Sequence, residues 1–144
     1  MKNFILLLLL TTFSTAFAQN WEPHFADAQA KAVQENKNIL LVFSGSDWCA
    51  PCIKLEKNVW QSEVFAKAAK DSWVVYKADF PKKKGNQLSA ELTNENKALA
   101  AKYNKAGNFP LVVLLDKNGK VLGMESFKNI AAEDYVQLIH AFEK

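Results

Sequence analysis

Trp48-Cys49-Ala50-Pro51-Cys52 holds both cysteines of the chain, separated by two residues. The residues from Ile39 to Phe43 form an unbroken apolar run before it, which is typical of a strand buried on both faces. After it, Cys52, Leu55 and Val59 recur at the spacing of one helical face. The proline of the motif suits the first turn of such a helix, because its missing N–H costs nothing there. The stretch therefore predicts a buried strand that leads through a turn into a helix, with the first cysteine at the helix N-terminus.

The rest of the chain alternates between helical and strand patterns. Helical periodicity predicts a helix over 21–36, with Phe25, Ala28, Ala32 and Val33 on its apolar face. Further helices are predicted after Ser62, after Asn94 and across Tyr135 to Phe142, and apolar strands at 73–78 and 111–115. The Asn118-Gly119 turn predicts an antiparallel partner strand at 121–127. The resulting order is α-β-α-α-β-α-β-β-α. It implies an α/β fold with a mixed central sheet of about four or five strands and helices on both faces.

Composition limits the class of protein. A chain of 144 residues without an internal repeat has room for one domain with one core. All 18 basic residues are lysines spread along the chain, for a net charge of +3, which argues against a nucleic-acid-binding protein. The two histidines, His24 and His140, lie near opposite ends of the chain, so we expect no metal site there.

Residues 1–18 have the pattern of a secretory signal peptide. Lys2 gives a positive start, Phe4 to Leu10 is apolar, and Ala16-Phe17-Ala18 is a small-residue cleavage site. An uncleaved membrane anchor is the alternative, but the apolar run is short for a bilayer span. We therefore expect cleavage near Ala18, a mature domain of residues 19–144, and a periplasmic or secreted protein.

Cys49 and Cys52 predict a redox-active pair. Their spacing brings the two sulfurs within bonding distance once the helix forms, and the helix N-terminus favours a thiolate at Cys49. We expect Cys49 to face solvent and act as the nucleophile, and Cys52, deeper on the helix, to resolve the mixed disulfide. A purely structural disulfide is disfavoured because so small a loop stabilises little. A metal site is disfavoured because the two cysteines supply only two ligands.

The motif resembles the active site of the thioredoxin family, with Ala50 where thioredoxin has glycine, and the order of elements is similar to the thioredoxin fold. The run from Cys52 to Lys57 with Val59-Trp60 further resembles the periplasmic C-terminal domain of the membrane disulfide reductase DsbD and the small secreted proteins related to it. The resemblance implies an exported thiol–disulfide oxidoreductase, leaning toward reductase. It would act on protein disulfides as a monomer without a cofactor, and a membrane thiol donor would supply its electrons.

The same resemblance implies a binding surface around the cysteines. Pro110 would be the cis-proline beside the disulfide, which leaves the backbone of Phe109 as an edge on which a substrate segment pairs. Trp48, Ala50 and Pro51 would complete the substrate-binding surface.

One family residue is missing from its usual place. Thioredoxin buries an aspartate on the strand before its motif, and the matching position here is Val42. Glu56, one turn after Cys52, is the expected substitute, because DsbD-like domains carry glutamate there. We hypothesise that Glu56 relays the proton of Cys52. The alternative is that Glu56 forms a surface ion pair with Lys57 or another lysine.

Two other functions remain open from the sequence. The fold could serve as a docking module whose disulfide is rarely cycled, or as a metal chaperone. The lysine run 82–84 could steer an acidic partner, although three lysines are a weak patch and a solvated loop is the simpler interpretation.

Overall fold

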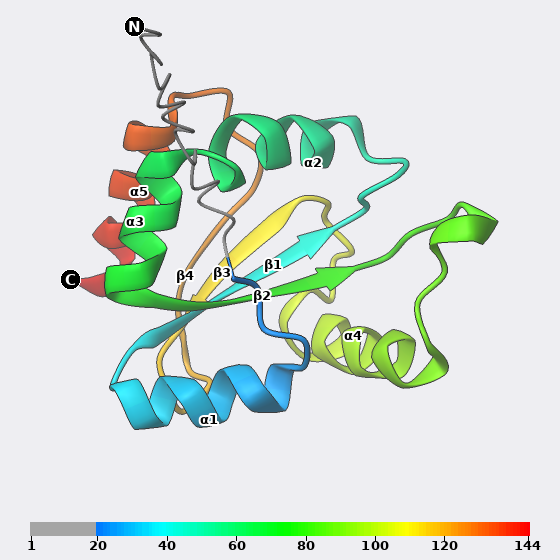
Figure 1. Cartoon of the computed structure of the whole chain (residues 1–144), viewed down its shortest axis with the longest axis horizontal. Coiled ribbons are helices and arrows are strands. Elements are labelled where there is room, and N and C mark those ends of the chain that lie inside the picture. Colours follow the sequence, from blue (N-terminus) through cyan, green and yellow to red (C-terminus); the bar gives the residue numbers. More distant parts are fainter. Residues whose placement is uncertain (1–19) are drawn as a thin grey trace, which may run out of the picture.

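The computed structural model describes residues 20–144 (Figure 1). The predicted signal peptide lies outside the described residues. Within them the chain forms one mixed sheet with the strand order β2-β1-β3-β4. β1 pairs parallel with β2 and antiparallel with β3, which pairs antiparallel with β4. The strands are β1 (Asn38–Ser44), β2 (Trp73–Asp79), β3 (Leu111–Leu115) and β4 (Val121–Glu125). The predicted α/β fold with a mixed sheet is confirmed.

Helices cover both faces of the sheet, also as expected (Figure 1). α1 (Phe25–Glu35) and α4 (Ala90–Tyr103) pack on one face. The other face carries α2 (Ala50–Leu55), the π-helix η1 (Glu56–Trp60), α3 (Glu63–Ser72) and α5 (Ala132–His140). The short 3₁₀ turns are η2 (Lys84–Asn86) and η3 (Ala141–Glu143). None of the helices in residues 20–144 is long and apolar enough to cross a membrane.

The position of β1 in the sheet explains why Ile39 to Phe43 are all apolar. Leu41 and Phe43 belong to the core under α1 and α4, whereas Leu40 and Val42 belong to the core under α2, α3 and α5. The strand is central in the sheet and buried on both faces, which an alternating strand could not satisfy. The turn and the helix of the cysteine motif therefore follow directly from the end of a strand that is buried on both faces.

The first helix differs from the prediction at both its start and its buried face. It begins at Phe25 rather than Trp21, because residues 21–24 are not helical and the N–H of Glu22 donates instead to the carbonyl of Val75 at 2.9 Å. Val33 is 58% exposed, so its expected place in the core is wrong. The buried stripe is fully supplied by Phe25, Ala28 and Ala32, at helical spacing of three and four.

The fourth helix begins four residues before the predicted cap. Ser89, not Asn94, is the N-cap residue, and its hydroxyl accepts the N–H of Leu92 at 3.2 Å. Asn94 lies inside α4. β4 likewise ends at Glu125, two residues before the predicted end of that strand.

His24 and Glu95 join the start of α1 to α4. Nδ1 of His24 lies 3.0 Å from Oε2 of Glu95, and the N–H of Phe25 donates to the other carboxylate oxygen. The hydrogen bond with Glu95 raises the pKa of His24 above its ordinary 6.5. Burial acts against the charged form of Glu95, but the bonds from Phe25 and His24 outweigh it and lower the pKa of this carboxyl below 4.5.

We expect this pair to make folding stability depend on pH. Because the pKa of His24 is raised in the folded state, its contribution is complete below pH 6.5 and disappears as the pH rises through the folded value. His24→Gln should therefore lower the urea midpoint at about pH 5.5 and change it little at about pH 8.5. An equal loss at both pH values would show that the ring stabilises by packing and not by charge.

Candidate active site

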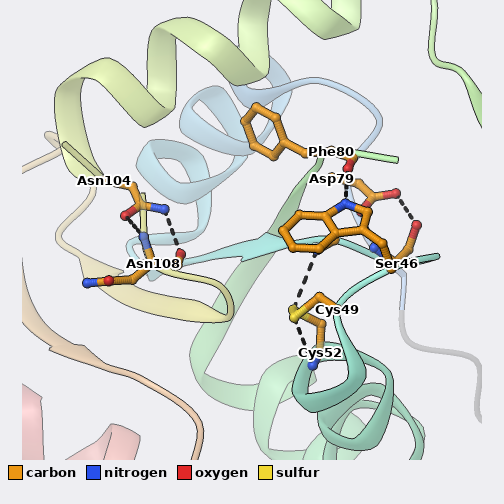
Figure 2. Close-up of a disulfide and its surroundings, with 9 residues drawn as sticks. Ser46, Cys49, Cys52, Asp79, Phe80, Asn104 and Asn108 are labelled. Carbon is orange, nitrogen blue, oxygen red and sulfur yellow. Dashed lines mark hydrogen bonds between the residues drawn. A yellow bond between two sulfur atoms is a disulfide. The ribbon is translucent and has the colours of Figure 1, made fainter. Parts of the chain in front are cut away.

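Cys49 and Cys52 are joined by a disulfide bond, with their Cα atoms 5.2 Å apart. Cys49 is the N-cap residue of α2, and its Sγ accepts the N–H of Cys52 at 3.3 Å. The N–H of Gly45 donates to Sγ of Cys52 at 3.5 Å (Figure 2). Each sulfur therefore has a backbone donor aimed at it, an arrangement that favours negative charge on sulfur once the bond is reduced.

The expectation that Cys49 faces solvent is wrong for the bonded pair. Cys49 is 5% exposed and Cys52 3% exposed. As the N-cap residue, Cys49 turns its sulfur toward the helix end, where it meets both Cys52 and the N–H that it accepts. The two cysteines are therefore almost equally buried. A substrate must make close contact with the surface around them to reach either sulfur.

Aromatic side chains form that surface. Trp48 is 39% exposed, and its Nε1 donates to the carbonyl of Phe80 at 2.6 Å. The ring of Phe109 lies 5.4 Å from the rings of both Trp48 and Phe80, centroid to centroid. Residues 50 and 51, at the start of α2, are exposed. The structure therefore brings two of the predicted surface residues, Trp48 and Phe109, into direct contact.

Gly45 allows the indole of Trp48 to take this position. A Cβ atom at residue 45 would stand 2.4 Å from Cε2 of Trp48, closer than real contacts allow. The same residue supplies the N–H that points at Cys52. The sequence indicated only a turn between the strand and the cysteine motif, and the glycine within that turn was the signal available.

The Phe109–Pro110 peptide bond is cis. β3 begins at the next residue, and Leu111 pairs with Phe43 near the end of β1 that leads into the motif. The loop before it is closed by Asn104, whose amide nitrogen donates to the carbonyl of Asn108 at 2.8 Å and whose oxygen accepts the N–H of Asn108 at 2.9 Å (Figure 2). The sequence did not point to this clamp, which fixes the residue next to Phe109.

Glu56 forms an ion pair with Lys77 of β2, so the predicted alternative of a lysine partner is confirmed, although the partner is not Lys57. Lys77 lies opposite Val42 in the parallel pairing of β1 and β2. Glu56 therefore pairs with the residue opposite Val42, the position at which the resemblance to thioredoxin implies an aspartate. The side chain of Glu56 is 34% exposed and is therefore accessible to water.

Two aspartates tie the turns around the cysteines together. Asp79, at the end of β2, accepts the N–H of Ser46 at 2.9 Å and also its hydroxyl (Figure 2). Asp47 accepts backbone N–H groups from the loop after β2, the first of them from Lys82.

In residues 20–144 no three His, Cys, Asp or Glu side chains are grouped so as to hold a metal ion.

The chain is similar to several known proteins. The sequence model of the family described as Thioredoxin-like matches residues 20–117. The disulfide bond reductase DsbH of Chlamydia pneumoniae is 35% identical over 119 residues, which are 83% of this chain and 69% of that protein. The solved structure of a DsbH oxidoreductase superposes with a TM-score of 0.80 at 34% identity, covering 93% of this chain and 91% of the other. The reduced C-terminal domain of Neisseria meningitidis DsbD has the same fold, with a TM-score of 0.56 at 18% identity over 81% of this chain and 92% of that domain.

These matches agree with what the cysteine motif implied. The family match spans more than half of the chain, and the similarity to DsbH extends across the bonded pair Cys49 and Cys52. The resemblance to DsbD extends to the fold of its C-terminal domain. The chain therefore belongs to the thioredoxin-like family, and it is a thiol–disulfide oxidoreductase.

Proposed function

We propose that this oxidoreductase works as an exported reductase of disulfide bonds in other proteins. The observation that carries the proposal is the cysteine pair at the N-terminus of α2, directly after the exposed Trp48, whose ring packs on Phe109 of the cis Phe109–Pro110 bond. The likeness to a protein named a disulfide bond reductase supports the direction of electron flow.

In the proposed reaction the reduced pair gives two electrons to the substrate disulfide. The thiolate of Cys49 attacks one substrate sulfur, the substrate S–S bond breaks, and the departing substrate sulfur takes up a proton. The thiolate of Cys52 then attacks the sulfur of Cys49 in the mixed disulfide. This step releases the second substrate thiol and leaves Cys49 and Cys52 joined, as they are in this structure.

The substrate segment is proposed to bind in an extended form. The backbone of Phe109 precedes the cis Pro110 and β3, and the neighbouring Asn108 is held by its two hydrogen bonds with Asn104. Pairing along this backbone would align a substrate cysteine with Cys49, while Trp48, Ala50 and Pro51 contact its side chains. Such an approach accounts for how a nearly buried sulfur is reached.

Export and electron supply complete the proposal. The pattern of residues 1–18 predicts a signal peptide cleaved near Ala18, which places the mature chain in the periplasm or outside the cell. Such compartments are oxidising, so a reductase there needs a partner that returns electrons to the pair. A membrane thiol donor is the expected source, acting on a monomer.

A reductase and a docking module give different results in an insulin reduction assay with dithiothreitol. If the protein cycles its cysteines, it should accelerate insulin precipitation over dithiothreitol alone, and a rate equal to that of the reagent would favour the docking module. In the native host, Cys52→Ser should accumulate mixed disulfides on Cys49, and these would identify the partners directly.

Glu56→Gln tests the proposed proton relay. The substitution keeps a hydrogen-bonding group near Lys77 but removes the acid, so the release of the mixed disulfide at neutral pH should slow by about tenfold or more. Quenched-flow trapping of the intermediate measures this step. Glu63→Gln, at an exposed position in the first turn of α3, is the matched control. An unchanged release rate in Glu56→Gln would leave only the ion pair as the role of this residue.

A further inference from the structure

We infer that the loop between β2 and α4 selects protein partners whose disulfide is flanked by acidic residues. This loop, residues 80–89, contains Lys82, Lys83 and Lys84 and no acidic residue. The inference rests on the proposed function, because it concerns which protein disulfides reach Cys49. From the sequence a solvated loop was the simpler interpretation and the steering of an acidic partner the alternative; the contacts of the loop with Asp47 hold it on the same side of the molecule as the turn after β1 (Figure 1).

Asp47, two residues before Cys49, is the first connection between the loop and the active site. Its carboxylate accepts the backbone N–H groups of Lys82 and Lys83, each at 2.9 Å. It also accepts the side-chain amide of Asn86 at 3.0 Å. Because Lys82 and Lys83 donate through their backbone N–H groups, the bonds orient the loop without using the ammonium groups of these lysines.

Trp48, directly before Cys49, is the second connection. Its indole Nε1 donates to the carbonyl of Phe80, and the ammonium group of Lys82 lies 3.9 Å from the centroid of its ring. A cation at this distance over an indole is attracted to it. Any partner that covers the exposed indole while it approaches Cys49 therefore meets a positive charge.

The positive charge of the chain is concentrated in the segments that build the site. Residues 44–55, 79–89 and 104–110 together hold five lysines and two aspartates, for a net charge of +3; Glu56, which follows the first of these segments, is ion-paired with Lys77 of β2. The whole chain also has a net charge of +3, so its remaining residues together are neutral. All five of these lysines are exposed; they are Lys54, Lys82, Lys83, Lys84 and Lys105.

These ammonium groups have no acidic partner in the described part of the chain, where the ion-paired lysines are others. The two aspartates of the same segments already accept protein donors, Asp47 from the loop and Asp79 from Ser46. Exposed and unpaired cations around one site produce a local positive potential, which accelerates the approach of a partner of opposite charge. A disulfide flanked by Asp or Glu has that charge.

Two matched peptides test the inference. Each carries one internal disulfide, flanked by Asp and Glu in the first and by Asn and Gln in the second. The rate constant for reduction by the reduced full-length mature protein is measured for each at low and at high salt. Dithiothreitol is measured in parallel, so that the intrinsic reactivity of the two disulfides is divided out. The corrected preference for the acidic peptide should be about fivefold at low salt and should largely vanish at high salt.

Lys83→Gln/Lys84→Gln should reduce this preference to less than about twofold, while reduction of the neutral peptide stays unchanged. Lys82 is kept in this variant because it contacts Trp48. The matched control is Lys67→Gln/Lys70→Gln, which removes the same charge from exposed positions on α3, and it should keep the preference.

The outcomes separate the inference from the proposed function. Failure to reduce either peptide faster than the reagent would overturn the proposed function. Reduction of both peptides with equal corrected rates would overturn only the inference. The inference would also fail if the loop variant lost binding to phosphatidylglycerol vesicles but kept its peptide preference, because the lysines would then recognise a lipid surface.

Discussion

Cys49→Ser is expected to abolish the reduction of protein disulfides, with a loss in rate of about a thousandfold or more. Cys49 supplies the sulfur that attacks the substrate. A serine hydroxyl at the N-terminus of α2 stays protonated at neutral pH and cannot replace this sulfur as the nucleophile. Cys52→Ser should lose turnover as well, but it should keep the first step and stop at the mixed disulfide. The two substitutions therefore give different products even though both stop the cycle.

Intact-mass spectrometry after mixing each variant with a disulfide peptide measures the difference. Cys52→Ser should gain the mass of one peptide thiol, and Cys49→Ser should gain none. The structure makes this a real test, because the two sulfurs are almost equally buried and each has a backbone donor. Adduct formation on Cys49→Ser alone would reverse the assignment of nucleophile and resolving cysteine.

Phe65→Ala is expected to have the largest effect on stability, about 3 to 5 kcal/mol. Phe65 is fully buried on α3, and its ring centroid lies 4.6 Å from that of Trp60 and 6.3 Å from those of Trp21 and Trp73. Three large rings cannot collapse into the space left by a fourth, so the cavity persists and adds to the lost burial of the ring itself.

Guanidinium unfolding of the oxidised protein, followed by circular dichroism, measures this loss. Val33→Ala is the matched control, since Val33 is 58% exposed on α1 and its truncation should change stability by less than about 0.5 kcal/mol. A loss for Phe65→Ala no larger than that of Val33→Ala would mean that the aromatic cluster does not support the fold.

The order of helices and strands could be predicted because each of them has a recognisable pattern of apolar residues in the sequence. The apolar runs of β1 and β3 are long and uninterrupted, since these central strands are buried on both faces. Ser62 is the N-cap residue of α3, as predicted, and its hydroxyl accepts the N–H of Phe65. The cysteine motif identified the active site because its spacing and flanking residues occur together in one short segment.

The details that the sequence did not predict depend on contacts between distant segments. Val33 fits the apolar stripe of α1 by spacing alone, but the core beneath the helix includes only Phe25, Ala28 and Ala32 of this stripe. Ser89 and Asn94 are both good caps, and the hydrogen bond at Ser89 decides between them. The burial of Cys49, the need for Gly45 and the clamp at Asn104 likewise arise only when the chain has folded around them.

The bond from Glu22 to Val75 also bears on self-association. β2 lies at one side of the sheet, where a strand exposes backbone groups that a second molecule can pair with. The residues before α1 cover part of that edge, because the N–H of Glu22 donates to the carbonyl of Val75. A chain cleaved near Ala18 keeps Glu22 and its hydrogen bond to Val75. A chain cleaved after Glu22 would lack this bond, and the exposed edge of β2 could then pair with a strand of a second molecule.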